Sequence, residues 1–261
     1  MVNLTERNGS RLNYSHLPLK PLALAVLLAF APLAANATDS TVDITNGTDS
    51  WYGNTGKTSN AGSDNTNASG NSVSVVTGAN AYYVYGGYVE NYGDADVAAD
   101  GNTVNMQDGS VRYVYGGLAF SNSSNASASD NKVTISGGTL SYDFYGGYAS
   151  SNSGNASATG NSVTISGGSV GYDVRGGFAQ STSGNASATG NSVTISDGSV
   201  DSNVYGGFAQ STSGNASATG NSVTISGGSV SGSVIGGYAY SNSGTGSATG
   251  NTVTISGTAQ L

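Results

Sequence analysis

Two aspartates and one arginine are the residues of this chain that come nearest to a catalytic set. Asp143 and Asp173 stand thirty residues apart at equivalent positions of a repeat, and Arg175 follows shortly after. If equivalent positions lie on neighbouring strands, the two carboxyl groups could stand ~5 Å apart, as in a retaining glycoside hydrolase. The next repeats carry Asn203 and Ser233 at this position, so a solvated acidic edge explains the two aspartates more simply.

Metal-binding and nucleophilic chemistry is poorly supported. Asp94, Asp96 and Asp100 lie close together in the sequence and could offer oxygen ligands to Ca²⁺. Asp143, Asp173 and Asn203, at equivalent positions of successive repeats, could do the same. These spacings lack the bidentate glutamate of an EF-hand, and the calcium-binding nonapeptide does not recur. The chain has no cysteine, and its one histidine, His16, lies in an N-terminal targeting segment, so no nucleophilic triad can be assembled. We therefore expect no catalysis, no metal and no cofactor.

A set of five residues forms the candidate binding surface, because all five directly precede a Gly–Gly pair at intervals of thirty residues. These residues are Tyr85, Tyr115, Tyr145, Arg175 and Tyr205. On the outside of stacked coils they would form a column that could bind sugar rings or a protein surface, with cation–π contacts from Arg175 to Tyr145 or Tyr205. Alternatively, the tyrosines stack only on one another and stabilise the sheet.

The repeat that must position these side chains has a period of thirty residues. Its Gly–Gly pairs begin at Gly86, Gly116, Gly146, Gly176, Gly206 and Gly236. A second block, of the form NSVTIS, places valine and isoleucine at the same interval, from Val133 and Ile135 to Val253 and Ile255. Apolar residues that alternate with serine and threonine are typical of half-buried strands, and a fixed period of this length is typical of solenoids.

Glycine and asparagine mark the corners of the repeat. Glycine after the NSVTIS block can supply a turn residue with positive φ. One bend position is always asparagine, and stacked asparagines can hydrogen-bond from coil to coil. These residues are Asn131, Asn161, Asn191, Asn221 and Asn251. The sequence therefore predicts an all-β protein, a parallel β-helix (β-solenoid) with coils of about 30 residues.

Three segments divide the chain. Residues 1–37 contain a basic flank at Lys20 and an apolar run, which predicts a signal peptide. The residues at the expected cleavage site are Ala35, Ala37 and Thr38. Residues 38–69 show no clear repeat and are expected to be flexible or to cap the first coil. Residues 70–261 form the repeat region, which we expect to be the β-solenoid.

The charge balance bears on location and partners. Removal of residues 1–37 leaves four basic and fourteen acidic residues. Such an acidic chain lacks the basic surface that nucleic acids and anionic lipids require, so neither is an expected partner. A signal peptide implies export through the Sec pathway, to the cell surface, the outer membrane or the medium.

The combination of YGGYA with ATGNSVTISGGSV, at Tyr145–Ala149 and Ala158–Val170, resembles the repeats of passenger domains in bacterial autotransporters. The resemblance covers residues ~70–261. It implies a β-helical passenger that is exported by Sec, crosses the outer membrane through a C-terminal barrel, and is displayed as an adhesin-like stalk. The sequence ends at Leu261 within a repeat, so the expected barrel translocator is not part of it.

Three functions are compatible with these features. The first is an exported, non-catalytic surface protein that acts as an adhesin or a structural stalk, with a host or cell-surface glycan or protein as its partner. The second is a secreted β-helix that binds or cleaves glycans through Asp143, Asp173 and the tyrosine column. The third is an extracellular fibre that assembles through an uncapped last coil, whose strand edges could pair with another chain.

Overall fold

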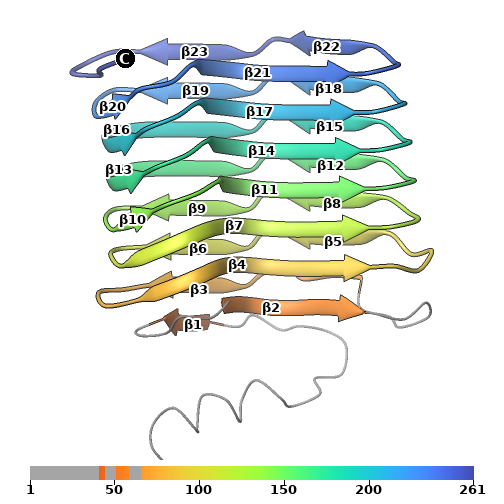
Figure 1. The fold of residues 1–261 in the computed structure, drawn as a ribbon, viewed down its shortest axis with the longest axis horizontal. Coiled ribbons are helices and arrows are strands. Elements are labelled where there is room, and N and C mark those ends of the chain that lie inside the picture. The colour runs from red at the N-terminus through yellow and green to blue at the C-terminus, as the bar shows by residue number, and fades with distance from the viewer. Residues whose placement is uncertain (1–40, 45–50, 59–65) are drawn as a thin grey trace, which may run out of the picture. The chain divides into compact units, whose positions relative to one another are not determined.

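The computed structural model describes residues 41–44, 51–58 and 66–261. The expected signal peptide, including Ala35, Ala37 and Thr38, lies outside these described residues. Every regular element within them is a β-strand, so none is a helix that could span a membrane. The strands stack as parallel coils thirty residues apart, which confirms the predicted all-β parallel β-helix (Figure 1).

Each coil has three walls, named here for their typical residues. The valine wall contains the NSVTIS block: β1 (Thr41–Ile44), β3 (Ser72–Val75), β6 (Thr103–Met106), β9 (Lys132–Ile135), β13 (Ser162–Val170), β16 (Ser192–Val200), β19 (Ser222–Ile225) and β23 (Thr252–Ile255). The Gly–Gly wall contains β2 (Trp51–Thr58), β4 (Asn80–Asn91), β7 (Ser110–Ser121), β11 (Phe144–Ser151), β14 (Val174–Ser181), β17 (Val204–Ser211) and β21 (Val234–Ser241). The alanine wall contains β5 (Val97–Asp100), β8 (Ala126–Ser129), β12 (Ala156–Thr159), β15 (Ala186–Thr189), β18 (Ala216–Thr219) and β22 (Gly246–Thr249). Two short strands, β10 (Thr139–Leu140) and β20 (Ser229–Val230), lie between the valine and Gly–Gly walls.

The ladder begins earlier than the sequence suggested. Strands β1 and β2 pair in parallel with β3 and β4, so residues 41–44 and 51–58 continue the stack of coils. Tyr52 lies opposite Tyr85, at an offset of thirty-three residues. This longer first repeat explains why the period of thirty did not reveal it.

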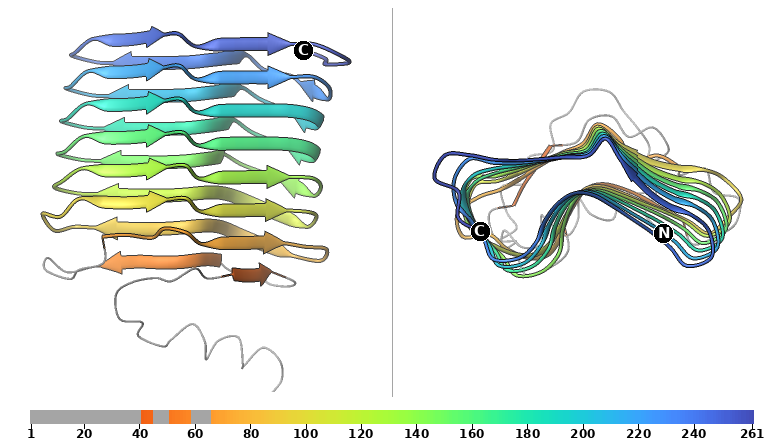
Figure 2. Two further views of the ribbon diagram at one scale, coloured as in Figure 1. Left: turned by 180° about the vertical axis from the view of Figure 1, so that it is seen from behind. Right: turned by 90° about the horizontal axis from the view of Figure 1, so that it is seen from above.

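Between residues 66 and 241, the stacked coils enclose two separate apolar cores. Viewed along the axis, the coil is bent and narrow in the middle, with a wider lobe at each end (Figure 2). The larger core lies between the valine wall and the first part of the Gly–Gly wall, and contains buried Ile165 and Phe144. The smaller core lies between the alanine wall and the second part of the Gly–Gly wall, and consists mainly of alanines such as Ala149 and Ala158.

The Gly–Gly pair and the bend asparagine together form the waist between these cores. A Cβ atom on Gly207 would lie 2.3 Å from Oδ1 of Asn221, across the waist of the same coil. A Cβ atom on Gly206 would lie 2.3 Å from the carbonyl oxygen of Gly236, in the next coil. The first glycine is therefore required for stacking and the second for the narrow waist.

The bend asparagines form the ladder that the sequence predicted. Nδ2 of Asn191 donates to Oδ1 of Asn221 in the next coil and to the carbonyl oxygen of Ala158, both at 2.9 Å. The backbone N–H of Asn191 donates to the same Oδ1 atom at 2.9 Å. Equivalent bonds join the other members of the series from Asn102 to Asn251. The ladder satisfies polar groups that are buried between two apolar cores.

Candidate binding surface

The predicted tyrosine column exists, but two of its members are buried. The rings of Tyr85, Tyr115 and Tyr145 stack with centroids 5.0 Å apart and interplanar angles of 13° and 12°. Arg175 and Tyr205 continue the column in register. Tyr85 and Tyr145 are only 8% and 7% exposed, so the expectation of an open aromatic surface is wrong for both. Their faces are covered by neighbouring rings, as the stacking alternative requires.

A second column lies beside the first and covers its edges. The strand bends at the Gly–Gly pair, so the residues on either side of the pair face the same side. Tyr145 and Tyr148 have ring centroids 5.2 Å apart, and those of Tyr205 and Phe208 are 5.3 Å apart. The members of the second column are Tyr88, Leu118, Tyr148, Phe178, Phe208 and Tyr238. Burial raises the pKa of Tyr115, Tyr145 and Tyr148 above the usual range, so these phenols stay protonated.

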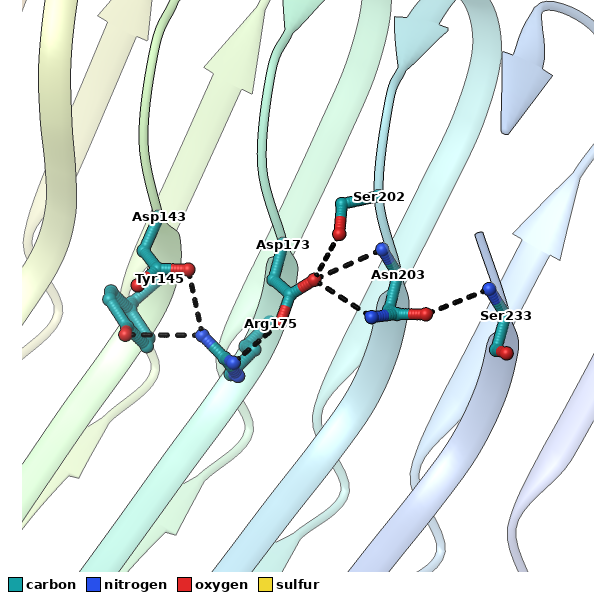
Figure 3. A network of polar contacts seen from close by, with 7 residues as sticks. All are labelled: Asp143, Tyr145, Asp173, Arg175, Ser202, Asn203 and Ser233. Atoms are coloured by element: carbon teal, nitrogen blue, oxygen red, sulfur yellow. Dashed lines mark hydrogen bonds and ion pairs between the residues drawn. The ribbon is translucent and has the colours of Figure 1, made fainter. Parts of the chain in front are cut away.

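Arg175 joins the two aspartates that the sequence singled out (Figure 3). Its Nη1 atom lies 3.1 Å from Oδ1 of Asp143, and its Nη2 atom lies 2.7 Å from Oδ2 of Asp173. Nη1 also donates to the hydroxyl of Tyr145 at 3.1 Å. The other carboxylate oxygen of Asp173 accepts bonds from the backbone N–H and the side-chain amide of Asn203. Because Asp173 is buried and both carboxylates are paired, the expectation of a solvated acidic edge is wrong.

Aromatic rings surround the guanidinium group of Arg175. Its Cζ atom lies 5.3 Å from the ring centroid of Tyr145 and 5.5 Å from that of Tyr205, which confirms the predicted cation–π contacts. The rings of Phe178 and Phe208 lie at 5.6 and 5.5 Å. Burial opposes the charge, but the neighbouring phenol and the two carboxylates outweigh it and raise the pKa of Arg175. The group stays a cation held inside the protein.

Elsewhere in residues 66–261, the acidic residues do not converge on one point. Oδ1 of Asp96 accepts the backbone N–H of Asn125, and Oδ1 of Asp100 accepts that of Ser129, both at 2.9 Å. These bonds join neighbouring coils, as the side-chain bonds of Asp173 do. Among residues 66–261, no three histidine, cysteine, aspartate or glutamate residues are grouped to hold a metal ion.

A second aromatic group, here called the corner cluster, was missed in the sequence. It consists of Tyr82, Arg112, Tyr113, Tyr142 and Tyr172. Tyr82 lies in β4, Arg112 and Tyr113 lie in β7, and Tyr142 and Tyr172 come two residues before β11 and β14. Tyr82, Tyr142 and Tyr172 are 38%, 42% and 51% exposed. The Cζ atom of Arg112 lies over the rings of Tyr82 and Tyr142, at 4.6 and 5.9 Å from their centroids. The signal was a tyrosine or arginine at intervals of thirty, two or three residues before the first column.

The described residues thus offer two kinds of surface. The two packed columns and the Arg175 network stabilise the coil, whereas the corner cluster presents exposed rings and a cation to solvent. Such a surface can bind a partner through ring edges, hydroxyl groups and one positive charge. The chain matches no protein-family model, no curated protein and no solved structure.

Proposed function

We propose that this chain is an exported, non-catalytic surface protein whose β-solenoid serves as a stalk or adhesin, organised like an autotransporter passenger. The observation that supports this proposal is the constant register of the coils. From β11 to β21, the strands of the Gly–Gly wall pair residue for residue at an offset of thirty. Each added coil therefore lengthens the molecule and leaves its cross-section nearly unchanged (Figure 2).

The state of the charged residues supports a non-catalytic role. A glycosidase pair needs one carboxyl group that can donate a proton and one that can act as a base or nucleophile. In this chain Asp143 and Asp173 share the cation of Arg175, and Asp173 also accepts three hydrogen bonds from the next coil. Both carboxylates are therefore used in packing one coil on another.

Export is tested with the full chain expressed in a bacterium that has a Sec pathway. Mass spectrometry of the periplasmic fraction should find a chain that begins at Thr38. The double substitution Ala35→Asp and Ala37→Asp should leave the precursor uncleaved, because the cleavage site needs small residues. A wild-type chain that stays in the cytoplasm with its N-terminus intact would refute the proposal.

The stalk role is tested by removing one coil. Gln180–Ser196 and Gln210–Ser226 are identical, so deletion of residues 181–210 restores the repeat at the junction. The shortened chain should keep its β-type circular dichroism, its melting temperature within a few degrees, and its adhesion to cells. Its long dimension, measured by small-angle scattering, should fall by ~5 Å. Loss of adhesion on removal of this one coil would indicate a local site and contradict the stalk.

A glycan array distinguishes the glycan-binding alternative from the stalk proposal. It predicts specific binding that is lost in Asp143→Ala or Tyr145→Ala, because both residues belong to the proposed sugar site. The stalk proposal predicts that these substitutions change only stability. A control is Asn185→Ala, whose side chain accepts the backbone N–H of Asn215 and takes no part in the Arg175 network.

A further inference from the structure

The corner cluster is not required by the fold. In the two coils that follow Tyr172, the equivalent position holds Ser202 and then Gly232. These coils keep the same pairing, with Val204 opposite Val234 and Gly207 opposite Gly237. The coil therefore closes equally well with small residues at this corner, and the exposed tyrosines need an explanation other than folding.

The central rings of the cluster cover one another's faces. The Tyr113 ring lies between those of Tyr83 and Tyr142, stacked at 4.9 and 5.0 Å with angles of 15° and 17°. The guanidinium of Arg112 covers one face each of Tyr82 and Tyr142. A sugar ring would need an open aromatic face, whereas ring edges and hydroxyl groups suit a protein surface, where Tyr and Arg commonly contribute most of the binding energy.

The charge of Arg112 points to the partner. No carboxylate within residues 66–261 forms an ion pair with Arg112, although Arg175 has two such partners. Three coils further along the same corner, exposed Asp201 has no side-chain partner among those residues. Three coils correspond to about 14 Å along the axis. We propose that the corner cluster is a homodimer interface in which two copies lie side by side and antiparallel, with Arg112 of each copy paired to Asp201 of the other.

A two-fold axis makes the rest of the corner self-complementary. For Arg112 to face Asp201 of the other copy, the axis must pass between the coils of Tyr142 and Tyr172. Each of these two tyrosines then faces the other one across the axis. At the end of the interface, the large side chain of Tyr82 faces the small residue Gly232. One operation therefore matches cation with anion, ring with ring, and large with small.

This inference does not depend on export or on the stalk role, and it is tested by sedimentation equilibrium of the full chain. The wild type should dimerise with a dissociation constant on the order of 10–100 µM, in the range of transient interfaces. Arg112→Asp and Asp201→Arg should each weaken dimerisation at least tenfold, because each places like charges in contact twice. Lys132→Asp, the same charge change on the valine wall, is the control and should have no effect.

Mixing the two variants gives the sharper test. Neither Arg112→Asp nor Asp201→Arg should dimerise alone, but an equimolar mixture should, because the heterodimer restores an opposite-charge pair at both contacts. Absence of dimers in the wild type at concentrations on the order of 0.1 mM overturns the proposal. So does a dimer of Arg112→Asp as tight as that of Lys132→Asp, which would indicate association through strand edges. Circular dichroism of each variant verifies that it is folded.

Discussion

The side-chain amide of Asn191 donates a 2.9 Å hydrogen bond to Oδ1 of Asn221, one coil further along the chain, and both side chains are fully buried. Asn191→Ala would remove this bond and leave the carbonyl of Ala158 and the backbone N–H of Asn161 without their partners. Each unsatisfied buried group costs ~1–3 kcal/mol, so we expect a loss of about 3–5 kcal/mol in unfolding free energy. Urea denaturation followed by circular dichroism measures it.

An exposed asparagine ladder provides the matched control. Oδ1 of Asn185 accepts the backbone N–H of Asn215 at 2.9 Å, but these residues are exposed to water. Asn185→Ala should therefore cost less than about 1 kcal/mol. Equal losses of unfolding free energy for Asn185→Ala and Asn191→Ala would show that water reaches the waist. Burial would then not be the reason that the inner ladder stabilises the fold.

The waist glycines should differ sharply from the bend glycines. A Cβ atom on Gly206 would clash with the next coil, so we expect Gly206→Ala to prevent stacking at that level or to cost more than about 3 kcal/mol. Gly220 has φ +63° but no atom within 4 Å of its Cβ position, so Gly220→Ala should cost only about 1 kcal/mol of backbone strain. Thermal unfolding compares the two variants. Similar melting temperatures would refute the steric account of the Gly–Gly pair.

Replacing Arg175 should destabilise the chain unless a carboxylate is removed with it. Arg175→Tyr restores the usual residue of the column but leaves Asp173 buried without its cation, which we expect to cost about 3 kcal/mol. The double variant Asp173→Asn with Arg175→Tyr reproduces the next coil, Asn203 and Tyr205, and should recover most of that loss. A double-mutant cycle in urea measures the coupling. Additive effects would mean that the ion pair contributes nothing.

Stability should fall at alkaline pH because of the buried phenols. The pKa of Tyr115 is raised by burial above its unfolded value of about 10, so its contribution is complete below pH 10 and is lost as pH rises towards the folded-state pKa. Each such tyrosine lowers the unfolding free energy by ~1.4 kcal/mol per pH unit above that point. Tyr115→Phe should therefore show a shallower decline than the wild type in urea titrations between pH 9 and 11. Identical slopes would show that Tyr115 ionises in the folded state.

The architecture could be predicted from the sequence because equal residues recur at equal intervals. Val163, Ile165 and Asn161 each lie opposite the same residue type in the next coil, so periodicity alone gives the register. The two cores were not predicted, because the separation depends on the approach of Gly147 to Asn161 across the coil, a contact between two walls.

The candidate surface was predicted less well. The alternation of a regular strand places residues three positions apart on opposite faces, but the bend at Gly–Gly brings Tyr145 and Tyr148 together. Burial of the first column follows from that bend. Tyr82 and Tyr83 are adjacent in β4 and neither is buried, so the alternation of a strand does not indicate them, and only the recurrence at intervals of thirty could have done so. The exposure of these tyrosines depends on how neighbouring coils pack, and the sequence of a single repeat does not reveal that packing.

The asparagine ladder gives the solenoid a direction. From Asn71 to Asn221, each bend asparagine donates a side-chain N–H to the side-chain oxygen of the bend asparagine in the following coil. The amide dipoles therefore add head to tail and polarise one another along the axis. A coil inserted in the opposite sense would set donor against donor at the waist. The buried asparagine ladder therefore accepts a new coil only when that coil runs in the same chain direction as the coils already in the stack.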